Sequence, residues 1–472
     1  MFKQFSQVQD FLNDKHIQDV DLKFCDLWGR WHHVTIPNQA FTEEILSEGV
    51  GFDGSSVGFK SVHSGDMVLI PDLGTGFVDP FWAKPTLSFI CNTYEADTKE
   101  RFSGDPRQIL HNAEGYLAKS GIADQSIWGP EFEFYVFDHL SFTNDINTAA
   151  YRVDSSEASW RGGDHELRYT IPLHGGYHAI PPNDQLYNLR SEISQGVNDA
   201  GIPVKYHHHE VGGPGQCEIE TPLLPIQQAG DAVMIIKYFT KMTAIKHGQI
   251  ATFLPKPLYG EAGNGMHFHQ QLLSNGKNAF YDPQGAHSLS QIALQYIGGL
   301  LRHAPALLAF TNPSTNSYRR LVPGFEAPIN AFFSVGNRSA AIRIPKYATH
   351  PREVRFEFRP PDATCNPYLA MAAMLLAGID GIEQGIDPTA AGFGPINEDI
   401  FSWSPKKREK IKSLPTSLGD ALRSLEKDHE FLTKNGVVPE SLIEQWLAVK
   451  SQEERAVRSR PHPYEIQLYF DL

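Results

Sequence analysis

The chain has 472 residues, of which 41% are hydrophobic and 20% are charged, and its formal net charge is −14. This length exceeds what one small core can organise, and the composition is that of an ordinary soluble globular protein, so two or more domains are expected. The acidic balance argues against nucleic acid or an anionic membrane as a partner, but it leaves room for a local basic pocket.

The N-terminus and the cysteines predict a compartment. The first residues, MFKQFSQVQDFLNDKH, are polar and lack the apolar core of a signal peptide. No apolar run approaches the roughly 18–20 residues of a membrane span. The four cysteines are far apart and form no CxxC pair, which is typical of reduced thiols. We therefore expect a cytoplasmic protein without membrane contacts.

The first hundred residues predict a small, mostly β domain. Its expected elements are an amphipathic helix at 1–15, two strands within 20–36 joined at Gly29, a loop at 50–59, and strands at 67–70 and 86–94. The loop contains Asp53, followed by Gly54 and Ser55, which is also the pattern of a simple Asx turn. The polar run 97–105 predicts a domain boundary, because Asp105–Pro106 starts a helix that Gly121 can end.

Two stretches place glutamates together. In the predicted strand 127–137, alternation puts Glu131 and Glu133 on one face and the phenylalanines on the other. Residues 205–220 predict a hairpin broken at a Gly-Gly-Pro-Gly run, which brings Glu210 and Glu218 side by side. Such carboxylates repel each other, so a divalent metal between them is one interpretation. The alternatives to a metal site are that Glu210 and Glu218 are solvated loop residues and that 127–137 is an edge strand.

The second half alternates helices with polar strands. Helices are expected at 226–250, 288–310 and from Asn366–Pro367 to about 384. After a glycine-rich turn, His267 and His269 share one strand face, which is weak evidence for a ligand site by itself. Between 318 and 359, arginines recur in strand-like surroundings, at Arg320, Arg338, Arg343, Arg355 and Arg359.

The arginines and the acids together predict a reaction class. In 355–359, alternation places Glu357 on the same face as two of the arginines. Guanidinium groups suit bidentate binding of phosphate and carboxylate, although structural ion pairs are the alternative. Several carboxylates with one imidazole fit Mg²⁺ or Mn²⁺ better than zinc. Since the chain has neither a Walker motif nor a kinase glycine loop, the residues predict a metal-dependent phosphoryl-transfer enzyme of unspecified type.

Several motifs identify a family. They are FDGSSVGF at 52–59, GPEFEF at 129–134, HHHEVGGPGQCEIE at 207–220, NGMHFHQ at 264–270, YRRLVPGFEAP at 318–328, NRSAAIRIP at 337–345, EVRFEFRPPDATCNPY at 353–368 and PHPYEIQLYFDL at 461–472. Over essentially its whole length the chain resembles bacterial type I glutamine synthetases. The resemblance implies an α+β fold, with a small N-terminal β-grasp-like domain at 1–104 and a large catalytic domain at 105–472 whose antiparallel sheet cavity is flanked by helices.

The resemblance also implies site residues. Two Mg²⁺ or Mn²⁺ ions are expected, one held by Glu133, Glu210 and Glu218 and the other by Glu131, His267 and Glu357. The glutamate substrate is expected at Gly263, Arg320 and Arg359, and ATP at His269, Arg338, Arg343 and Arg355. The implied catalytic residues are Asp53, which deprotonates ammonium across a subunit boundary, Glu326 on a flap, and Arg338.

The implied reaction is ATP-driven formation of γ-glutamyl phosphate followed by attack of ammonia, in a dodecamer of two hexameric rings with active sites between subunits. Two alternatives remain: a γ-glutamyl-amine ligase of the same superfamily, against which the retained Asp53 and Glu326 argue, and a non-catalytic homologue, against which the complete ligand set argues. The family usually has asparagine where this chain has Ala262, so glutamate binding is expected to differ, with Asn264 as a candidate substitute. Phe401 stands where many relatives carry an adenylylated tyrosine, so no such control is expected.

Overall fold

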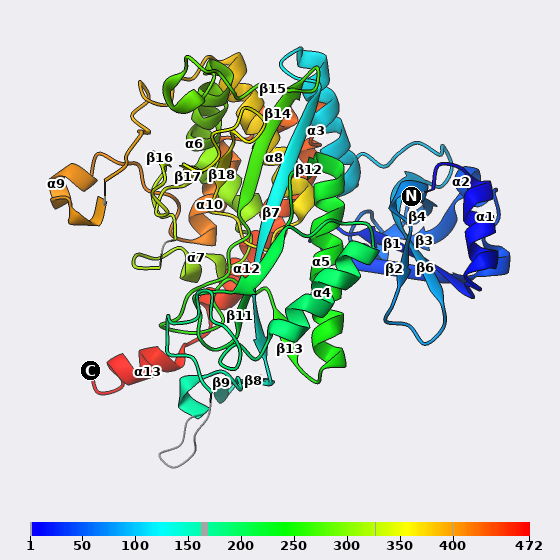
Figure 1. Ribbon diagram of the computed structural model, residues 1–472, viewed down its shortest axis with the longest axis horizontal. Helices are drawn as coiled ribbons and strands as arrows, with labels where there is room; N and C mark the ends of the chain where they lie inside the picture. Colours follow the sequence, from blue (N-terminus) through cyan, green and yellow to red (C-terminus); the bar gives the residue numbers. More distant parts are fainter. Residues whose placement is uncertain (1, 162–168, 326, 399) are drawn as a thin grey trace.

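The N-terminal residues form a sheet of their own beside a larger body in the computed structural model, which describes residues 2–161, 169–325, 327–398 and 400–472 (Figure 1). The elements of this lobe are α1 (Phe5–Asp14), β1 (Asp19–Cys25), β2 (Trp31–Pro37), α2 (Ile45–Glu48), β3 (Val50–Asp53), β4 (Asp66–Pro71), β5 (Phe77–Asp79) and β6 (Thr86–Glu95). The strand order is β2-β1-β6-β4-β3, with β1 parallel to β6 and β5 beside β6. Helix α1 buries Phe5, Val8 and Leu12, as its apolar spacing predicted.

The larger body is built on a mixed sheet. Its strands are β7 (Gln125–Phe137), β10 (Tyr206–His209), β11 (Gln216–Glu220), β12 (Leu224–Pro225), β13 (Ile250–Thr252), β14 (Phe268–Ser274), β15 (Lys277–Asn278), β16 (Phe333–Val335), β17 (Ile342–Ile344) and β18 (Phe356–Phe358). The order along the sheet is β10-β11-β7-β14-β18-β17-β16. Most neighbours are antiparallel, and β16 with β17 is the parallel pair.

The larger body also contains helices, some of which pack against this sheet. They are α3 (Pro106–Ser120), α4 (Tyr187–Asp199), α5 (Ile226–Lys246), α6 (Gln291–Thr311), α7 (Ser317–Arg320), α8 (Pro367–Glu383), α9 (Pro405–Arg408), α10 (Leu418–Lys427), α11 (Glu430–Thr433), α12 (Glu440–Arg458) and α13 (Pro463–Tyr469). The predicted start of α3 is confirmed, because the Asp105 side chain caps Arg107 N and Pro106 occupies the first turn. Gly121 ends the helix in the left-handed conformation, at φ +74°.

Strand β7 changes partners along its length, and this positions the site. Its first half pairs with β14, where Phe268 lies opposite Pro130, and its second half pairs with β11. The stretch leading into β14 stays beside β7, because Glu131 N donates to the His267 carbonyl at 3.0 Å. Phe132 and Phe134 are fully buried in the same core as the helices. Glu131 and Glu133 therefore point to the other face, between β11 on one side and the histidine strand on the other.

The two lobes meet at the start of α8. Asn366 caps this helix, and its Nδ2 donates to the carbonyls of Asp26 and Leu27 at 3.0 and 3.1 Å. The ring of Trp28 stacks on Trp446, with centroids 5.5 Å apart. The predicted boundary between residues 104 and 105 stays a prediction; β6 ends at residue 95 and α3 begins at residue 106.

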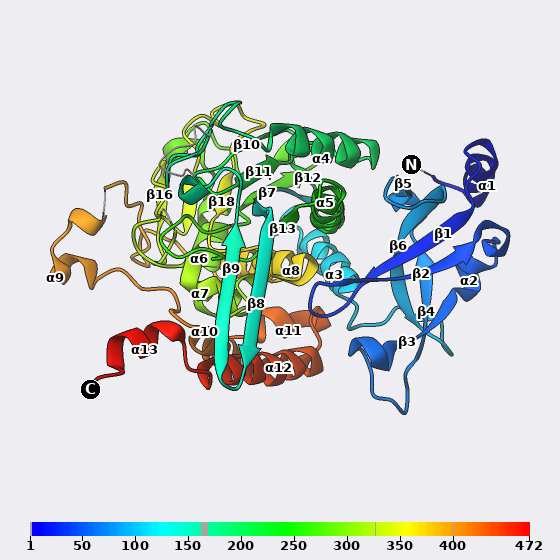
Figure 2. The same cartoon turned by 90° about the horizontal axis from the view of Figure 1, so that it is seen from below.

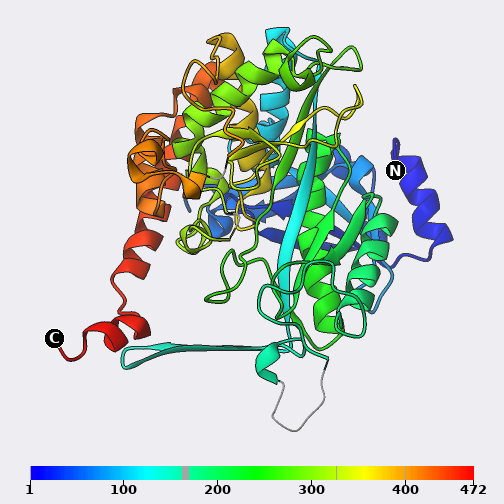
Figure 3. The same ribbon diagram turned by 60° about the vertical axis from the view of Figure 1, so that its left-hand side comes forward.

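Two segments project from the large body. Figure 3 shows the hairpin of β8 (His139–Asp145) and β9 (Thr148–Asp154) running away from the sheet, with α13 and the C-terminus near its tip. In Figure 2 the same hairpin lies in front of the larger body, and Leu140 of β8 lines a cavity together with Trp28 and Trp31 of the N-terminal lobe. Large apolar side chains are exposed on both segments, including Phe142, Ile146 and Phe470. Within the described ranges, no helix is long and apolar enough to cross a membrane.

The predicted elements are largely confirmed, with two local corrections. The stretch 50–59 is not one loop, because its first residues form β3 and the next form a 3₁₀ turn. The helix predicted at 226–250 ends earlier, at Lys246, and its Ile245 is 65% exposed. It lies in the last turn of α5, where the helix runs past the edge of the core.

Candidate active site

Cross-strand pairs of glutamates form one side of the site. In the β7–β11 ladder, Glu133 lies opposite Glu218 and Glu131 lies opposite Glu220. Residues two apart on a strand share a face, so all four side chains point the same way. Like charges directly opposite each other are destabilising in a sheet, so this surface requires cations. We call these four residues and Glu210 the acidic wall.

Glu210 joins the acidic wall from the end of β10. Its backbone N donates to the Gln216 carbonyl at 2.9 Å, whereas the residue directly opposite Glu218 is His208. Glu210 and Glu218 nevertheless lie close, because with His208 they offer ligand atoms within 4.8 Å of one another. Burial and the neighbouring carboxylates raise the pKa of Glu210 and of Glu218 well above the usual range. The predicted proximity of these two glutamates is therefore confirmed.

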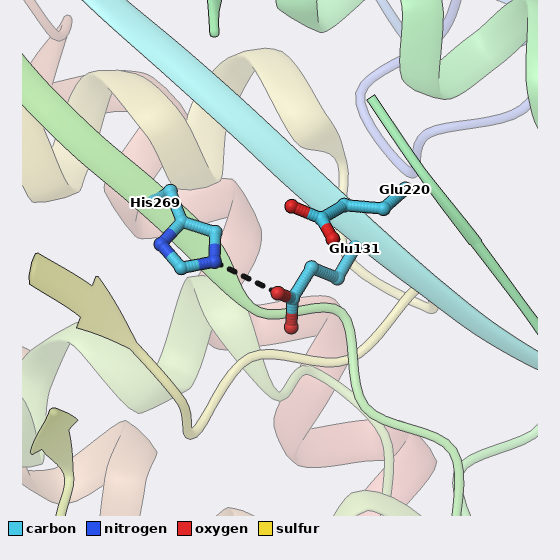
Figure 4. Close-up of side chains that lie close together, drawn as sticks. All are labelled: Glu131, Glu220 and His269. Carbon is cyan, nitrogen blue, oxygen red and sulfur yellow. Dashed lines mark hydrogen bonds and ion pairs between the residues drawn. The ribbon is translucent and has the colours of Figure 1, made fainter. Parts of the chain in front are cut away.

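Two histidines flank Glu131 on its other side. The two carboxylate oxygens of Glu131 lie 3.0 Å from His267 Nδ1 and 2.8 Å from His269 Nε2. Burial alone would raise the pKa of Glu131, but His269 and His267 outweigh it and hold this pKa well below the usual range. Figure 4 shows Glu131 between His269 and Glu220, which together form a second group with ligand atoms within 4.8 Å.

Glu357 lies at the centre of an arginine cluster. Its oxygens accept hydrogen bonds from Arg359 Nη1 and, at 2.9 Å, from Arg343 Nη1. Burial raises the pKa of Glu357, but Arg359 leads the opposing effects and the net pKa is lowered. Arg355 lies beside this pair, with its Nε 3.3 Å from His269 Nδ1. We call Arg343, Arg355, Arg359 and Glu357 the arginine wall.

Four residues of the acidic wall, all but Glu220, and Arg343 and Arg359 of the arginine wall line one cavity of ≈ 550 Å³. Most of the residues that the resemblance implies line it, namely Glu131, Glu133, Glu210, Glu218, Gly263, His267, Arg320, Arg338, Arg343 and Arg359. Three other described residues of the larger body that the resemblance implies do not line the cavity. They are His269, Arg355 and Glu357, and they lie directly behind the lining residues. A cavity with carboxylates on one side and guanidinium groups on the other can hold cations together with an anionic substrate.

The backbone near Gly263 is packed closely against Arg320. A Cβ at residue 263 would lie 2.5 Å from the Pro255 carbonyl oxygen and 2.8 Å from Arg320 Cγ, so only glycine fits. Arg320 is itself buried, and its Nη1 donates to the Pro360 carbonyl at 2.7 Å. Asn264 is also buried, and it binds Gln216 and the Leu254 carbonyl instead of lining the cavity. Its suggested role as a substitute at residue 262 is therefore not supported.

Asp53 lies outside this cavity. It is exposed on the N-terminal lobe, where its oxygens accept hydrogen bonds from Ser55 N at 2.9 Å, Ser55 Oγ at 2.7 Å and Ser56 Oγ at 2.6 Å. These bonds lower the pKa of Asp53. It lines a different surface cavity, together with Lys60 and His63. Glu326, the predicted flap residue, lies outside the described residues.

Glu220 and His208 are potential ligands that the sequence analysis missed. Glu220 is two residues after Glu218 on the same strand, so the alternation rule that grouped Glu131 with Glu133 could have found it. His208 is two residues before Glu210, but it belongs to a run of three histidines whose individual directions depend on the register of the hairpin.

The fold and the cavity define a two-domain enzyme whose cavity is lined by carboxylates and guanidinium groups. Residues 103–469 match the family described as "Glutamine synthetase, catalytic domain", and residues 16–96 match "Glutamine synthetase, beta-Grasp domain". The chain therefore belongs to the glutamine synthetase family, and its N-terminal lobe is a β-grasp domain.

Relatives match over the full length. A glutamine synthetase of Streptomyces coelicolor is 46% identical, covering 100% of both chains, and one of Mycolicibacterium smegmatis is 45% identical, covering 98% of both. Among solved structures, a glutamine synthetase of Plasmodium falciparum superposes with a TM-score of 0.89 at 28% identity, covering 99% of both chains. A structure titled as a complex of GmaS with ADP gives a TM-score of 0.81 at 26% identity, covering 98% of this chain and 99% of that chain.

Proposed function

We propose that this chain ligates ammonia to L-glutamate at the expense of ATP, through a γ-glutamyl phosphate intermediate. The observation that carries the proposal is the single cavity in which an acidic wall faces an arginine wall. Full-length relatives at about 45% identity that are named glutamine synthetase support the same reaction.

The residues of the acidic wall fit divalent cations. Glu210 Oε2 and Glu220 Oε2 are buried without a hydrogen-bond partner, and such orphaned oxygens indicate a missing ligand. We assign one Mg²⁺ or Mn²⁺ ion to Glu133, Glu210 and Glu218, and a second to Glu131, His267 and Glu357. When bound, these ions neutralise charge on polyphosphate oxygens.

The remaining residues are assigned to the two substrates, glutamate and the nucleotide. We assign the glutamate substrate to Gly263, Arg320 and Arg359, and the nucleotide to His269, Arg338, Arg343 and Arg355. Arg338 is exposed at the cavity, so its guanidinium is free to reach a transferring phosphoryl group, where it stabilises the developing charge. The side chain of Arg320 is fixed by backbone carbonyls and therefore presents its charge in one direction.

Capture of ammonium requires a second subunit in this proposal. Asp53 is exposed and lies in the N-terminal lobe, whereas the described lining of the catalytic cavity comes entirely from the larger body. We therefore assign Asp53 to the site of a neighbouring subunit, where its carboxylate would take a proton from ammonium, and Glu326 to a flap over glutamate. A dodecamer of two hexameric rings provides this arrangement, and the exposed apolar side chains of the β8–β9 hairpin and α13 are suited to contacts between subunits.

Two further properties belong to the proposal. The described cysteines are free and buried, which suits a reducing cytoplasm. Tyrosine adenylylation is not expected to control the enzyme, because Phe401 has no hydroxyl group and no tyrosine occurs between residues 369 and 463.

The second candidate is a ligase that joins glutamate to a larger amine, and Ala262 is the observation that favours it. A small side chain stands at this edge of the cavity, where the family usually has asparagine.

Phosphate release should be measured with ATP and glutamate in the presence of ammonium or a series of primary amines. Glutamine synthetase activity predicts release with ammonium and little with the amines. Preference for an amine favours the second candidate, and no release with either supports a non-catalytic homologue.

A further inference from the structure

Lys256 is a half-buried cation to which the proposed function assigns no role. Its backbone is held by Asn316, because Lys256 N donates to Asn316 Oδ1 at 2.6 Å and the Lys256 carbonyl accepts from Asn316 Nδ2 at 3.2 Å. Its Nζ donates to the carbonyl of Glu261 and lies 3.7 Å from the centroid of the Phe325 ring. This distance is well inside the range of about 6 Å for cation–π attraction. The side chain therefore joins two segments that are far apart in the chain.

Both of these segments belong to the catalytic cavity. Phe325 lines the cavity directly, and the Glu261 carbonyl immediately precedes Ala262 and Gly263, which line it as well. Lys256 itself lies behind this lining, on the far side of its two partners. Because Gly263 is one of the residues assigned above to the glutamate substrate, Lys256 is placed to act on that substrate through its neighbours.

His174 joins the same two segments from within the cavity lining. Its backbone N donates to Glu261 Oε1 at 2.8 Å, and its ring centroid lies 5.8 Å from that of Phe325. Lys256 and His174 thus each contact both Glu261 and Phe325, and the four residues form a closed set of contacts. The position of the Phe325 ring depends on this set.

The positive charge of Lys256 is lost just above neutral pH. Burial lowers the pKa of Lys256 to about 8, while Glu261 opposes this shift and Arg320 adds to it. His174 is a further titratable side chain that faces both Glu261 and Phe325. A neutral amine has no cation–π attraction and is a weaker donor than an ammonium group, so both contacts of Lys256 weaken as the pH rises through this value.

We propose that Lys256 is a positioning residue for the glutamate substrate, which fixes Phe325 and the 261–263 backbone relative to Arg320. The proposal rests on the proposed function, because that function assigns Gly263 and Arg320 to glutamate. A pocket held in one arrangement binds its ligand without the cost of ordering the pocket first. Since Lys256 does not contact the reacting atoms, it is expected to affect KM for glutamate and to leave kcat nearly unchanged.

The competing explanation is that Lys256 only stabilises the loop that contains it. In that case its charge has no specific effect on glutamate, and substitutions lower kcat and thermal stability together. The pH dependence of KM separates the two explanations, because only the positioning role couples the protonation of Lys256 to glutamate binding.

The test measures product formation from glutamate, ATP and hydroxylamine by the full-length protein with saturating Mg²⁺, between about pH 7 and pH 9. Hydroxylamine is already uncharged in this range, so the nucleophile does not titrate. In the wild-type protein KM for glutamate is expected to rise with pH toward the value of Lys256→Met, with little change in kcat. Lys256→Met should have KM raised by about tenfold at every pH. Lys256→Arg should keep a low KM up to pH 9, because guanidinium stays charged.

Two further variants and a folding control complete the experiment. Phe325→Leu removes the ring and should abolish most of the pH dependence of KM. Lys241 is the matched control, because burial also lowers its pKa but it lines a different cavity, so Lys241→Met should behave as the wild type. Thermal melting at both ends of the pH range should show each variant to be folded.

Three results overturn the proposal alone, while the proposed function stands. They are a KM for glutamate that does not change with pH in the wild-type protein, a wild-type KM in Lys256→Met, and a parallel loss of kcat in Lys256→Met and Lys256→Arg. Absence of product from the wild-type protein at every pH overturns the proposed function, and this proposal with it.

Discussion

The two walls of the cavity differ in how their charges are balanced. In the acidic wall, glutamates face glutamates across β7 and β11, and burial together with their mutual repulsion raises the pKa of Glu210 and Glu218. In the arginine wall, Glu357 is already neutralised by Arg343 and Arg359. The acidic wall is therefore incomplete without cations, whereas the arginine wall is balanced within the chain.

The difference indicates which carboxylates are available as ligands. A glutamate that is already paired with two guanidinium groups must release at least one of them before it can bind a metal. Glu357 is in this position, and Glu218 is not. Function is therefore expected to be most sensitive to changes in the acidic wall, and stability to changes in the arginine wall.

The largest effect is expected from the acidic wall. Glu218→Ala removes one carboxylate from the first metal and leaves that ion under-coordinated beside polyphosphate, so glutamine formation should fall by more than about 100-fold. Circular dichroism should show an intact fold, since the change relieves repulsion. Activity near the wild-type level in the presence of saturating Mg²⁺ would refute the ligand assignment.

A second prediction tests a carboxylate that lies outside both walls. Asp53→Ala should reduce glutamine formation from ammonium at least about tenfold more than product formation from hydroxylamine, which is already uncharged at neutral pH. Parallel assays with the two nucleophiles measure this ratio. Asn at the same position is the matched control, because its Oδ1 can keep the two hydrogen bonds from Ser55 without the charge, while its Nδ2 cannot accept from Ser56 Oγ. Equal losses with both nucleophiles would assign Asp53 a structural role.

A third prediction compares the stability of the two walls directly. Glu357→Gln leaves buried guanidinium groups without their counter-charge and should lower stability by about 3–5 kcal/mol. Glu218→Gln, made in the same metal-free protein, should leave stability unchanged or raise it, because a repelled carboxylate is removed. Urea unfolding of both variants measures the difference. The comparison fails if both variants are destabilised alike.

The smallest effect on stability is expected for His303, which is remote from the cavity. His303 lies between two carboxylates, with Nε2 3.0 Å from Asp380 and Nδ1 2.9 Å from Asp428. Burial lowers the pKa of His303, but the bonds to Asp380 and Asp428 outweigh it and the net pKa is raised; Arg302 and Lys434 add positive charge beside Asp380.

The raised pKa determines the direction of the pH dependence. The imidazolium of His303 contributes its full stabilisation below the unfolded pKa of about 6.5 and loses it as the pH rises through the raised folded value. His303→Gln should therefore cost about 1–3 kcal/mol at pH 6 and less at pH 9. Thermal melting across this range measures the effect. A loss of stability in His303→Gln that increases with pH would contradict this account.

Local patterns in the sequence determined much of the fold and the membership of the site. Alternation in 127–137 separated Glu131 and Glu133 from the buried phenylalanines, and Asp105, Pro106 and Gly121 marked the ends of α3 correctly. These features depend on neighbouring residues only, so the sequence was sufficient. The motifs added the family, which the full-length relatives confirm.

Only the tertiary structure decided how strands pair and which charges are already neutralised. The register of β11 against β7 places Glu220 opposite Glu131, and the register of β18 against β17 places Arg343 beside Glu357. Register depends on contacts between segments that are far apart in the chain, and a shift by one residue would reverse every side chain. The sequence alone therefore named most of the acids, but it could not determine which of them retain an unpaired oxygen.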